Sequence, residues 1–282
     1  MRTLHWGLLG LLVILLSVII GIRSCAGPVK IESGFFAEHR IYTGPRAEVW
    51  TARFSPGDSL IAAACVDSTL RVWRADGTLV AALTAASGLT CAEWEPGGQS
   101  LAATAYDGAV YRWSWPGGKP LQRYSNHEGT AWTLRFSPDG SLLASAGEDG
   151  FVIVRDIASG TVRHSLRGHE RNVWDIAFTP DGKTLASGSF DNSVVFWNTV
   201  SGAQLRRYSG HSGAVVSLAF SADGRTLASS SDDKTVQLQD VATGKLLRTL
   251  NTPEHQQSVS FSQDGKWLIT SGRDKNMMGE LL

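Results

Sequence analysis

The sequence has no net charge, because 26 Lys and Arg residues balance 26 Asp and Glu residues over 282 positions. Nucleic acids and anionic surfaces attract proteins that carry an excess of positive charge, so this balance argues against a general nucleic-acid-binding function. Cysteine is also scarce. Its three occurrences, Cys25, Cys65 and Cys91, show no spacing typical of metal ligands, and we expect Cys65 and Cys91 to be small buried apolar residues.

The sequence also lacks the motifs of several enzyme classes. It contains no phosphate-binding loop, no metal-ligand spacing and no isolated acid and base pair. We therefore expect no metal, no cofactor, no small-molecule substrate and no catalytic residue. Glycine and tryptophan are abundant instead, with 30 and 10 residues, which predicts many tight turns between strands that carry aromatic side chains.

The longest hydrophobic run lies near the N-terminus. After a short polar stretch at 1–5, residues 6–22 carry no charge and would measure about 25 Å as a helix, enough to span a bilayer. We expect an uncleaved hydrophobic helix that anchors the protein in a membrane, followed by a linker at 23–39. The alternatives are a signal segment cleaved near Ala26, after a small-x-small motif, and a lipidated Cys25.

The short tail before this run favours an orientation with the N-terminus inside the cytoplasm and the remaining domain outside it. The expected protein is therefore a single-pass membrane protein with an extracytoplasmic domain. After cleavage near Ala26, it would instead be secreted or periplasmic.

A repeat of about 42 residues occupies the rest of the chain. A turn aspartate recurs at spacings of 40 to 42 residues, with an aromatic residue or its replacement six positions later. The pairs are Asp67/Trp73, Asp107/Trp113, Asp149/Arg155, Asp191/Trp197, Asp233/Gln239 and Asp274/Glu280. Around each pair the pattern predicts four short antiparallel strands, which cannot bury both faces of a sheet unless neighbouring repeats cover them.

With these repeats the chain resembles the WD40-repeat family of β-propellers, in a bacterial type with an N-terminal membrane anchor. The stretch GHERNVWDIAFTPDGKTLASGSFDNSVVFWN at 168–198 is close to the consensus of that family, and the resemblance extends over 40–282. It implies an all-β propeller of six detected repeats, the last degenerate or truncated. Their approximate bounds are 43–83, 84–124, 125–166, 167–208, 209–250 and 251–282.

The resemblance also implies a structural chain of hydrogen bonds among His, Ser, Asp and Trp inside each repeat. The fourth repeat has all four residues, namely His169, Ser187, Asp191 and Trp197. The third has His127, Ser145 and Asp149 with Arg155 at the tryptophan position, and the fifth has His211, Ser229 and Asp233 with Gln239 there. The first two keep Asp67, Trp73, Asp107 and Trp113 but have Pro45, Ala85, Ala63 and Ala103 at the histidine and serine positions. A catalytic triad would be a single exposed constellation, so this repetition favours a structural role.

Two interpretations of the last repeat remain open. After Asp274 the sequence KNMMGELL shows no alternation and contains an interior glycine, so it predicts a poor strand. In one interpretation six repeats close a ring, with residues 39–44 as the closing strand. In the other, which we favour, the chain is a truncated or frameshifted part of a protein with seven or more repeats.

In this family, partners bind the face that carries the aspartate turns and the loops before each first strand, around a central channel. The position four residues before the end of each first strand holds Trp50, Thr90, Trp132, Trp174, Val216 and Gln257. The position before each turn aspartate holds Val66, Tyr106, Glu148, Phe190, Asp232 and Arg273. Aromatic residues dominate interface hot spots. We therefore predict a partner-binding surface of Trp50, Trp132, Trp174, Tyr106, Phe190, Glu148, Asp232 and Arg273, the alternative being that the tryptophans only pack between repeats.

Taken together, these patterns predict a non-catalytic, membrane-tethered scaffold that binds a protein or peptide partner. One alternative is a propeller enzyme or small-ligand binder that uses the central channel. Another is a regulatory domain that is a fragment of a larger truncated protein. The fold alone does not choose between them, because propellers host unrelated functions.

Overall fold

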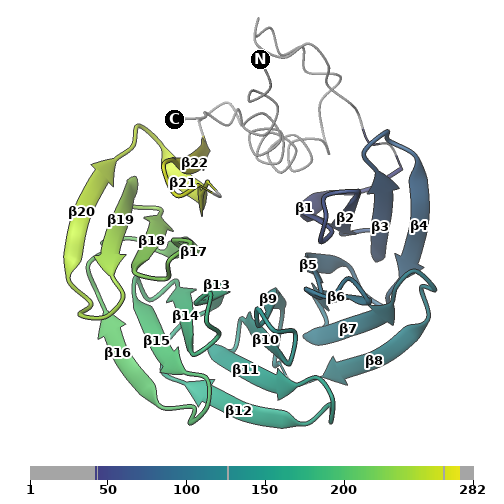
Figure 1. The fold of residues 1–282 in the computed structure, drawn as a ribbon, viewed down its shortest axis with the longest axis horizontal. Helices are drawn as coiled ribbons and strands as arrows, with labels where there is room; N and C mark the ends of the chain where they lie inside the picture. The colour runs from purple at the N-terminus through teal and green to yellow at the C-terminus, as the bar shows by residue number, and fades with distance from the viewer. Residues whose placement is uncertain (1–41, 43, 126, 263, 274–282) are drawn as a thin grey trace, which may run out of the picture. The chain divides into compact units, whose positions relative to one another are not determined.

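The computed structural model describes residue 42 and residues 44–125, 127–262 and 264–273. The predicted helix at 6–22, the linker at 23–39 and the strand expected after Asp274 lie outside these residues. Throughout the described ranges the regular structure is β, with 22 strands in six sheets (Figure 1). A search of the same ranges for a helix long and apolar enough to cross a membrane finds none.

The chain forms two compact units, the first from residues up to 105 and 111–123 and the second from 106–110 and 124 onward. The first contains β1 (Val49–Phe54), β2 (Leu60–Cys65), β3 (Thr69–Arg74), β4 (Leu79–Thr84), β5 (Leu89–Trp94), β6 (Ser100–Ala105) and most of β7 (Ala109–Ser114) and β8 (Pro120–Ser125). The second contains β9 (Ala131–Phe136), β10 (Leu142–Gly147), β11 (Phe151–Asp156), β12 (Val162–Arg167), β13 (Val173–Phe178), β14 (Thr184–Ser189), β15 (Val194–Asn198), β16 (Gln204–Tyr208), β17 (Val215–Phe220), β18 (Thr226–Ser231), β19 (Thr235–Asp240), β20 (Leu246–Asn251), β21 (His255–Phe261) and β22 (Leu268–Arg273).

The sheets repeat one topology. Five of them have four strands in chain order, β1 to β4, β5 to β8, β9 to β12, β13 to β16 and β17 to β20, and the sixth pairs β21 with β22. The four-stranded antiparallel repeat predicted from the sequence is therefore present. Residues 39–44 were expected to form a closing strand, but the two of them that the structure describes, Tyr42 and Gly44, are not in a strand. Tyr42 instead packs edge-on against Trp73 of β3, with ring centroids 5.9 Å apart.

The second strands of the four-stranded sheets are among the most buried, and their sequences explain why. The second strands, such as LLASAG in β10 and TLASGS in β14, consist mainly of small residues and are almost fully buried. Small side chains on both faces let neighbouring sheets approach closely. The fourth strands, such as β12 and β20, are largely exposed at the sheet edge.

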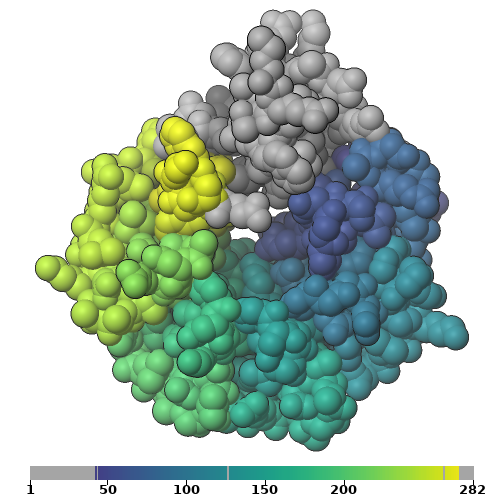
Figure 2. Space-filling model, viewed as in Figure 1, coloured from purple at the N-terminus to yellow at the C-terminus, as the bar shows by residue number. Residues whose placement is uncertain are grey.

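The core of the second unit lies between adjacent sheets. One cluster joins Val154 and Leu166 of the third sheet to Ile176 and Trp197 of the fourth. A second joins Phe196 to Val215 and Leu218 of the fifth sheet, and a third joins Val236 to Val259 of the sixth. The space-filling view shows these sheets lying against one another (Figure 2). Burial of apolar side chains between sheets is therefore the main stabilising contribution within this unit.

The turn between the first two strands has a shared chemistry, seen clearly in the third sheet. The Ser137 hydroxyl donates to Asp139 Oδ1 at 2.5 Å and accepts from the Leu142 N–H at 2.9 Å. Gly140 follows with a φ of 72°, in the left-handed region that favours glycine. The SPDG and TPDG motifs thus encode a hairpin that closes on its own side chains.

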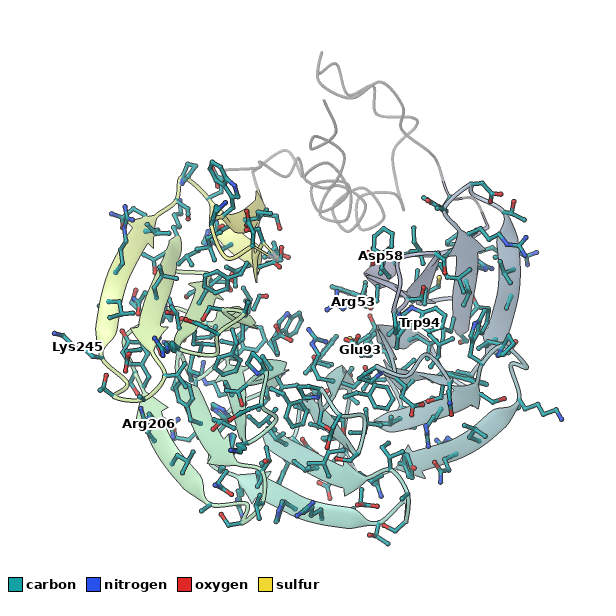
Figure 3. The ribbon with its side chains drawn as sticks, viewed as in Figure 1. Arg53, Asp58, Glu93, Trp94, Arg206 and Lys245 are labelled. Atoms are coloured by element: carbon teal, nitrogen blue, oxygen red, sulfur yellow. The ribbon has the colours of Figure 1, made fainter. Side chains whose placement is uncertain are left out.

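Polar side chains on the first strands also link neighbouring sheets. In the first unit, Arg53 of β1 and Glu93 of β5 point toward each other, with Nε and Oε2 3.4 Å apart (Figure 3). In the second unit the Asp175 carboxylate of β13 accepts from Arg135 Nη2 of β9 at 2.9 Å and from the Leu218 N–H of β17 at 3.0 Å. Asp175 is only 7% exposed. The carboxylate of Asp175 therefore connects its own sheet, the fourth, to the third and fifth sheets.

We expect Asp175→Ala to lower the free energy of unfolding by about 3 kcal/mol, because it leaves a partly buried guanidinium and a buried N–H without their acceptor. Ser217→Ala is the matched control. Ser217 holds the equivalent position in β17 and accepts one bond, from the Val259 N–H at 3.3 Å, so we expect a loss of about 1 kcal/mol. Urea unfolding of both variants measures the difference, and equal losses would contradict the special role of Asp175.

Candidate functional site

Each first strand of the six sheets contains a β-bulge near its start. The strand pairing skips one residue in every case, and the skipped residues are Trp50, Thr90, Trp132, Trp174, Val216 and Gln257. They share the register of the repeat from which Trp50, Trp132 and Trp174 were predicted as partner contacts. A bulge leaves its extra residue outside the ladder and changes the direction of its side chain.

Four aromatic side chains of the second unit form a continuous series, which we call the aromatic column: Tyr106, Trp132, Trp174 and Phe190. Trp132 and Trp174 are tilted by 30° with ring centroids 4.7 Å apart. Tyr106 meets Trp132 edge-on at 5.8 Å, and Phe190 meets Trp174 in the same way at 5.2 Å. The column therefore combines two bulge residues with two residues that precede a turn aspartate.

The aromatic column packs together and is also open to solvent. Tyr106 is 36% exposed, and Trp132, Trp174 and Phe190 are half-buried. The rings thus pack on one another and are not fully buried, and partner contact by the tryptophans stays a prediction. Trp50 is 44% exposed and belongs to the first unit, so it is described separately from the column.

The other predicted contact residues occupy the turn position in three sheets. Glu148 is exposed, and its Oε2 accepts from the Thr130 N–H at 3.0 Å. Asp232 is half-buried, and its backbone N–H donates to Ala214 O at 3.0 Å. Arg273 ends β22, where its backbone pairs with His255, and its side chain lies outside the described structure.

The four polar residues expected to form a chain in the fourth repeat are hydrogen-bonded to one another. His169 Nδ1 lies 2.9 Å from Asp191 Oδ2, and its Nε2 lies 2.7 Å from Ser187 Oγ. Because a carboxylate only accepts, Nδ1 donates, which leaves Nε2 of the neutral ring to accept from the serine hydroxyl. Trp197 Nε1 donates to the same hydroxyl oxygen at 2.9 Å. The chain connects the loop before β13 to the turn after β14 and to β15.

The third and fifth sheets contain the same histidine bonds with different final members. His127 and His211 bond to Asp149 and Asp233 and to Ser145 and Ser229, at distances between 2.8 and 3.0 Å for the shortest contact of each pair. At the tryptophan position of the fifth sheet, Gln239 donates to Ser229 Oγ at 3.3 Å. In the third sheet, Arg155 donates to Gly160 O at 2.9 Å and lies over the Tyr124 ring at 3.9 Å. Glutamine thus replaces the tryptophan hydrogen bond, whereas arginine makes other contacts.

The first sheet uses a partner for its turn aspartate that the sequence reasoning missed. Asp67 lacks a histidine, and Arg71 of β3 approaches it instead, with Nη2 and Oδ2 3.1 Å apart. Arg71 is 9% exposed. A charged residue in the otherwise apolar strand TLRVW, four positions after the aspartate, was the available signal. Burial, reinforced by the Asp67 charge, raises the pKa of the neighbouring Cys65 thiol to about 11, so Cys65 is a buried, protonated residue as expected.

In the second sheet, Asp107 accepts from the Ala109 N–H at 3.1 Å. Trp113 is buried and stacks on Tyr111, with an interplanar angle of 15°. Thr90 and Thr104 bond to each other at 2.9 Å in the interior of this sheet. The second sheet therefore satisfies its buried polar groups without the histidine and serine.

The histidine–aspartate pairs also fix the loops that lead into the strands with the bulges. Each carboxylate accepts a second bond from the backbone N–H that follows the histidine, as Asp149 does from Glu128 and Asp191 from Glu170, both at 3.1 Å. Burial alone would raise the pKa of the Asp191 carboxyl, but hydrogen bonds from His169 and Ser193 outweigh it and hold the pKa well below its usual range. Burial also opposes the lowering of the other two pKa values, but hydrogen bonds outweigh it, led by His127 for Asp149 and by the Thr235 hydroxyl and the Ser212 N–H, with His211, for Asp233. The loops before Trp132 and Trp174 are thus anchored by charged groups.

The hydrogen-bonded His, Ser and Asp sets contain the residue types of a hydrolase triad, but they are not accessible to a substrate as a triad is. The side chains of His127, His169 and His211 are fully buried, and the serine hydroxyls are engaged inside the sheets. A group of three His, Cys, Asp or Glu side chains able to hold a metal ion is not found within the described ranges.

A family model described as WD domain, G-beta repeat, matches residues 37–74, 118–156, 160–198, 202–240 and 244–278. These segments cover more than half of the chain. The unmatched stretch between the first two segments contains β5, β6 and β7, which belong to a four-stranded sheet like the others. No curated protein matches the chain.

We expect Asp191→Ala to lower the free energy of unfolding by at least about 2 kcal/mol. It removes the acceptor of His169, of the Glu170 N–H and of Arg207, and each buried group left without a partner costs about 1 to 3 kcal/mol. Asp181→Ala, in the exposed hairpin turn of the same sheet, should cost less than about 1 kcal/mol. Chemical unfolding of the two variants tests this, and a similar small loss in both would show that the chain does not stabilise the fourth sheet.

Stability should fall on acidification in two stages. Burial, only partly offset by Asp233, lowers the pKa of His211 below the ordinary value of 6.5. The unfolded chain therefore takes up a proton that the folded chain does not, and stability decreases as the pH falls below 6.5. Asp149, Asp191 and Asp233 have lowered pKa values, so their contribution is complete above 3.8 and is lost as the pH falls below it.

Thermal unfolding across this pH range measures both stages. A His211→Gln variant should show a smaller loss of stability in the upper stage, and also a smaller contribution of Asp233 to the lower stage, because His211 helps to lower the pKa of Asp233. A wild-type melting temperature that rises on acidification from 6.5 would contradict the assignment of His211 as a buried neutral side chain.

Proposed function

Because the chain belongs to the WD40-repeat family, whose repeats generally act as scaffolds for protein interactions, we propose that it is a non-catalytic scaffold that binds a protein or peptide on the aromatic column. The observation that carries this proposal is the stacking of Trp132 and Trp174, which are only partly buried, at two β-bulges. Large rings at such positions offer contact area at a low cost in side-chain entropy.

The bulge itself does not require an aromatic residue. Thr90, Val216 and Gln257 occupy the same position in other sheets and form the same register shift. Trp132 and Trp174 are therefore larger than the backbone geometry demands, and part of each ring remains in contact with water. This excess of exposed aromatic surface supports a binding role for the column.

Hydrogen bonds hold the loops next to the aromatic column in place, so the column is preorganised for binding. The loop before Trp132 is held by the Asp149 carboxylate and the loop before Trp174 by the Asp191 carboxylate. A surface that is already ordered loses less conformational freedom when it binds. The triad-like residues are buried in structural chains, which supports binding rather than hydrolysis as the role of this face.

The proposal extends to Trp50, Glu148, Asp232 and Arg273 as further contacts, and to attachment to a membrane through residues 6–22. The uncharged run at these positions supports an anchor with the repeats on the extracytoplasmic side, and cleavage near Ala26 would release them. Alkaline extraction of membranes together with protease treatment of intact cells tests this. An anchored, protease-accessible domain agrees with it, and a chain extracted without detergent and protected from protease does not.

Short peptides selected from a displayed random library on the full chain provide the test of the binding surface. We expect Trp132→Ala combined with Trp174→Ala to weaken the binding of selected peptides by about 30-fold, since a true hot spot contributes about 2 kcal/mol. Trp267→Ala is the matched control, because Trp267 is 70% exposed and directly precedes β22, at the opposite end of its sheet from the bulge.

Melting temperatures of the same variants separate binding from folding. A double variant that melts near the wild type but loses binding supports the surface. If the double variant binds as well as the Trp267→Ala control, the interaction surface lies elsewhere. A double variant that unfolds can be replaced by Trp132→Phe with Trp174→Phe, which keeps stacking and reduces ring area.

A further inference from the structure

The acidic residues around the aromatic column fall into two groups. Asp149, Asp191 and Asp233 are each paired with a histidine inside a sheet. Glu128, Glu148, Glu170 and Asp232 lie on the same loops and turns and make no ion pair with any residue in the described part of the chain. Glu128, Glu148 and Glu170 are exposed, and Asp232 is half-buried. The charge of the second group is therefore not balanced by an ion pair among the described residues, although Glu148 accepts a backbone hydrogen bond.

Two of these carboxylates share the register of the aromatic residues. The position before the turn aspartate is Tyr106, Glu148, Phe190 and Asp232 in four successive sheets, so Glu148 falls between the two smaller rings of the column. Its Oε2 is held by the Thr130 N–H, while Oε1 accepts no hydrogen bond from the described residues. This oxygen is oriented by the loop and remains able to accept from a partner.

Positive charge on this face is sparse. In the described loops and turns of the second unit that carry the column, the lysine and arginine residues are Arg171 and Lys234. Arg207 of β16 also reaches this face, but it is paired with Asp191 and bonds to Gly168 O. Four carboxylates without an ion pair against Arg171 and Lys234 therefore leave an excess of negative charge beside an apolar surface. Such a surface favours a partner of opposite charge through both the rate of encounter and the choice of partner.

The geometry of the aromatic rings indicates which groups of this surface would bind a positively charged partner. Trp132 contacts Tyr106 and Trp174, and Trp174 contacts Trp132 and Phe190, so each tryptophan has two aromatic neighbours in the column. A cation–π site needs an open ring face, which this stacking restricts. Recognition of a cation therefore falls to the carboxylates, and the rings provide an apolar contact.

We infer that the occupant of the aromatic column is a basic peptide segment of a partner protein, in which apolar side chains cover Trp132 and Trp174 while lysine or arginine side chains bond to Glu148 and Asp232. This inference rests on the proposed function and specifies the class of partner. Arginine fits the carboxylates best, because its planar guanidinium bonds to a carboxylate in a two-point arrangement.

The library selection on the full chain tests the inference directly. Selected peptides should contain more lysine and arginine than the starting library. Glu148→Gln combined with Asp232→Asn should weaken their binding by about tenfold and reduce its dependence on salt. Asp223→Asn, which removes one charge from the exposed hairpin turn at the other end of the fifth sheet, should leave both unchanged.

The outcomes separate this inference from the proposed function. Binding that requires Trp132 and Trp174 but selects neutral or acidic peptides, or is unaffected by the amide variants, overturns the basic partner and leaves the binding surface in place. Binding that does not depend on the tryptophans overturns the surface and the inference together. Enrichment of basic peptides whose affinity depends on both the tryptophans and the carboxylates supports both.

Discussion

The structure of the second unit depends on one interaction, the hydrogen bond between a turn aspartate and a buried loop histidine. In three consecutive sheets the aspartate also accepts from the backbone N–H after that histidine, and the histidine reaches a serine on the second strand. Loop, turn and strand are thereby connected through groups that have no water to replace their partners. Unpaired polar groups in a sheet interior are costly, so the arrangement is cooperative.

Replacements in this chain show that different side chains can occupy the same position of the repeat and bond to the same neighbouring group. Gln239 donates to Ser229 where Trp197 donates to Ser187, and Arg71 approaches Asp67 where other sheets use histidine. Arg155 bonds to a backbone carbonyl and covers Tyr124 instead of bonding to Ser145. The replacement is only partly equivalent, because Arg71 Nη1 and Gln239 Oε1 are buried without a hydrogen-bond partner among the described residues.

The proposed binding surface is a consequence of the same framework. The anchored loops lead into first strands whose bulges free one side chain from the ladder, and in two sheets that side chain is a tryptophan. The neighbouring turn position adds Tyr106, Phe190 or a carboxylate, depending on the sheet. Variation at two positions of an invariant backbone thus gives each sheet a different contribution to one surface, which is how a scaffold acquires specificity without a change of fold.

The sequence by itself determined the features that depend on local spacing. The 42-residue period, the four strands of each repeat, the His169, Ser187, Asp191 and Trp197 set and the positions of the bulge residues all follow from intervals within one repeat. Tertiary structure decided the relations between repeats. Rings of Trp132 and Trp174, 42 residues apart, stack at 4.7 Å, and Asp175 bonds to sheets before and after its own. Such contacts depend on the angle and separation at which two sheets pack, and these come from the summed fit of buried side chains, which no interval in the sequence records.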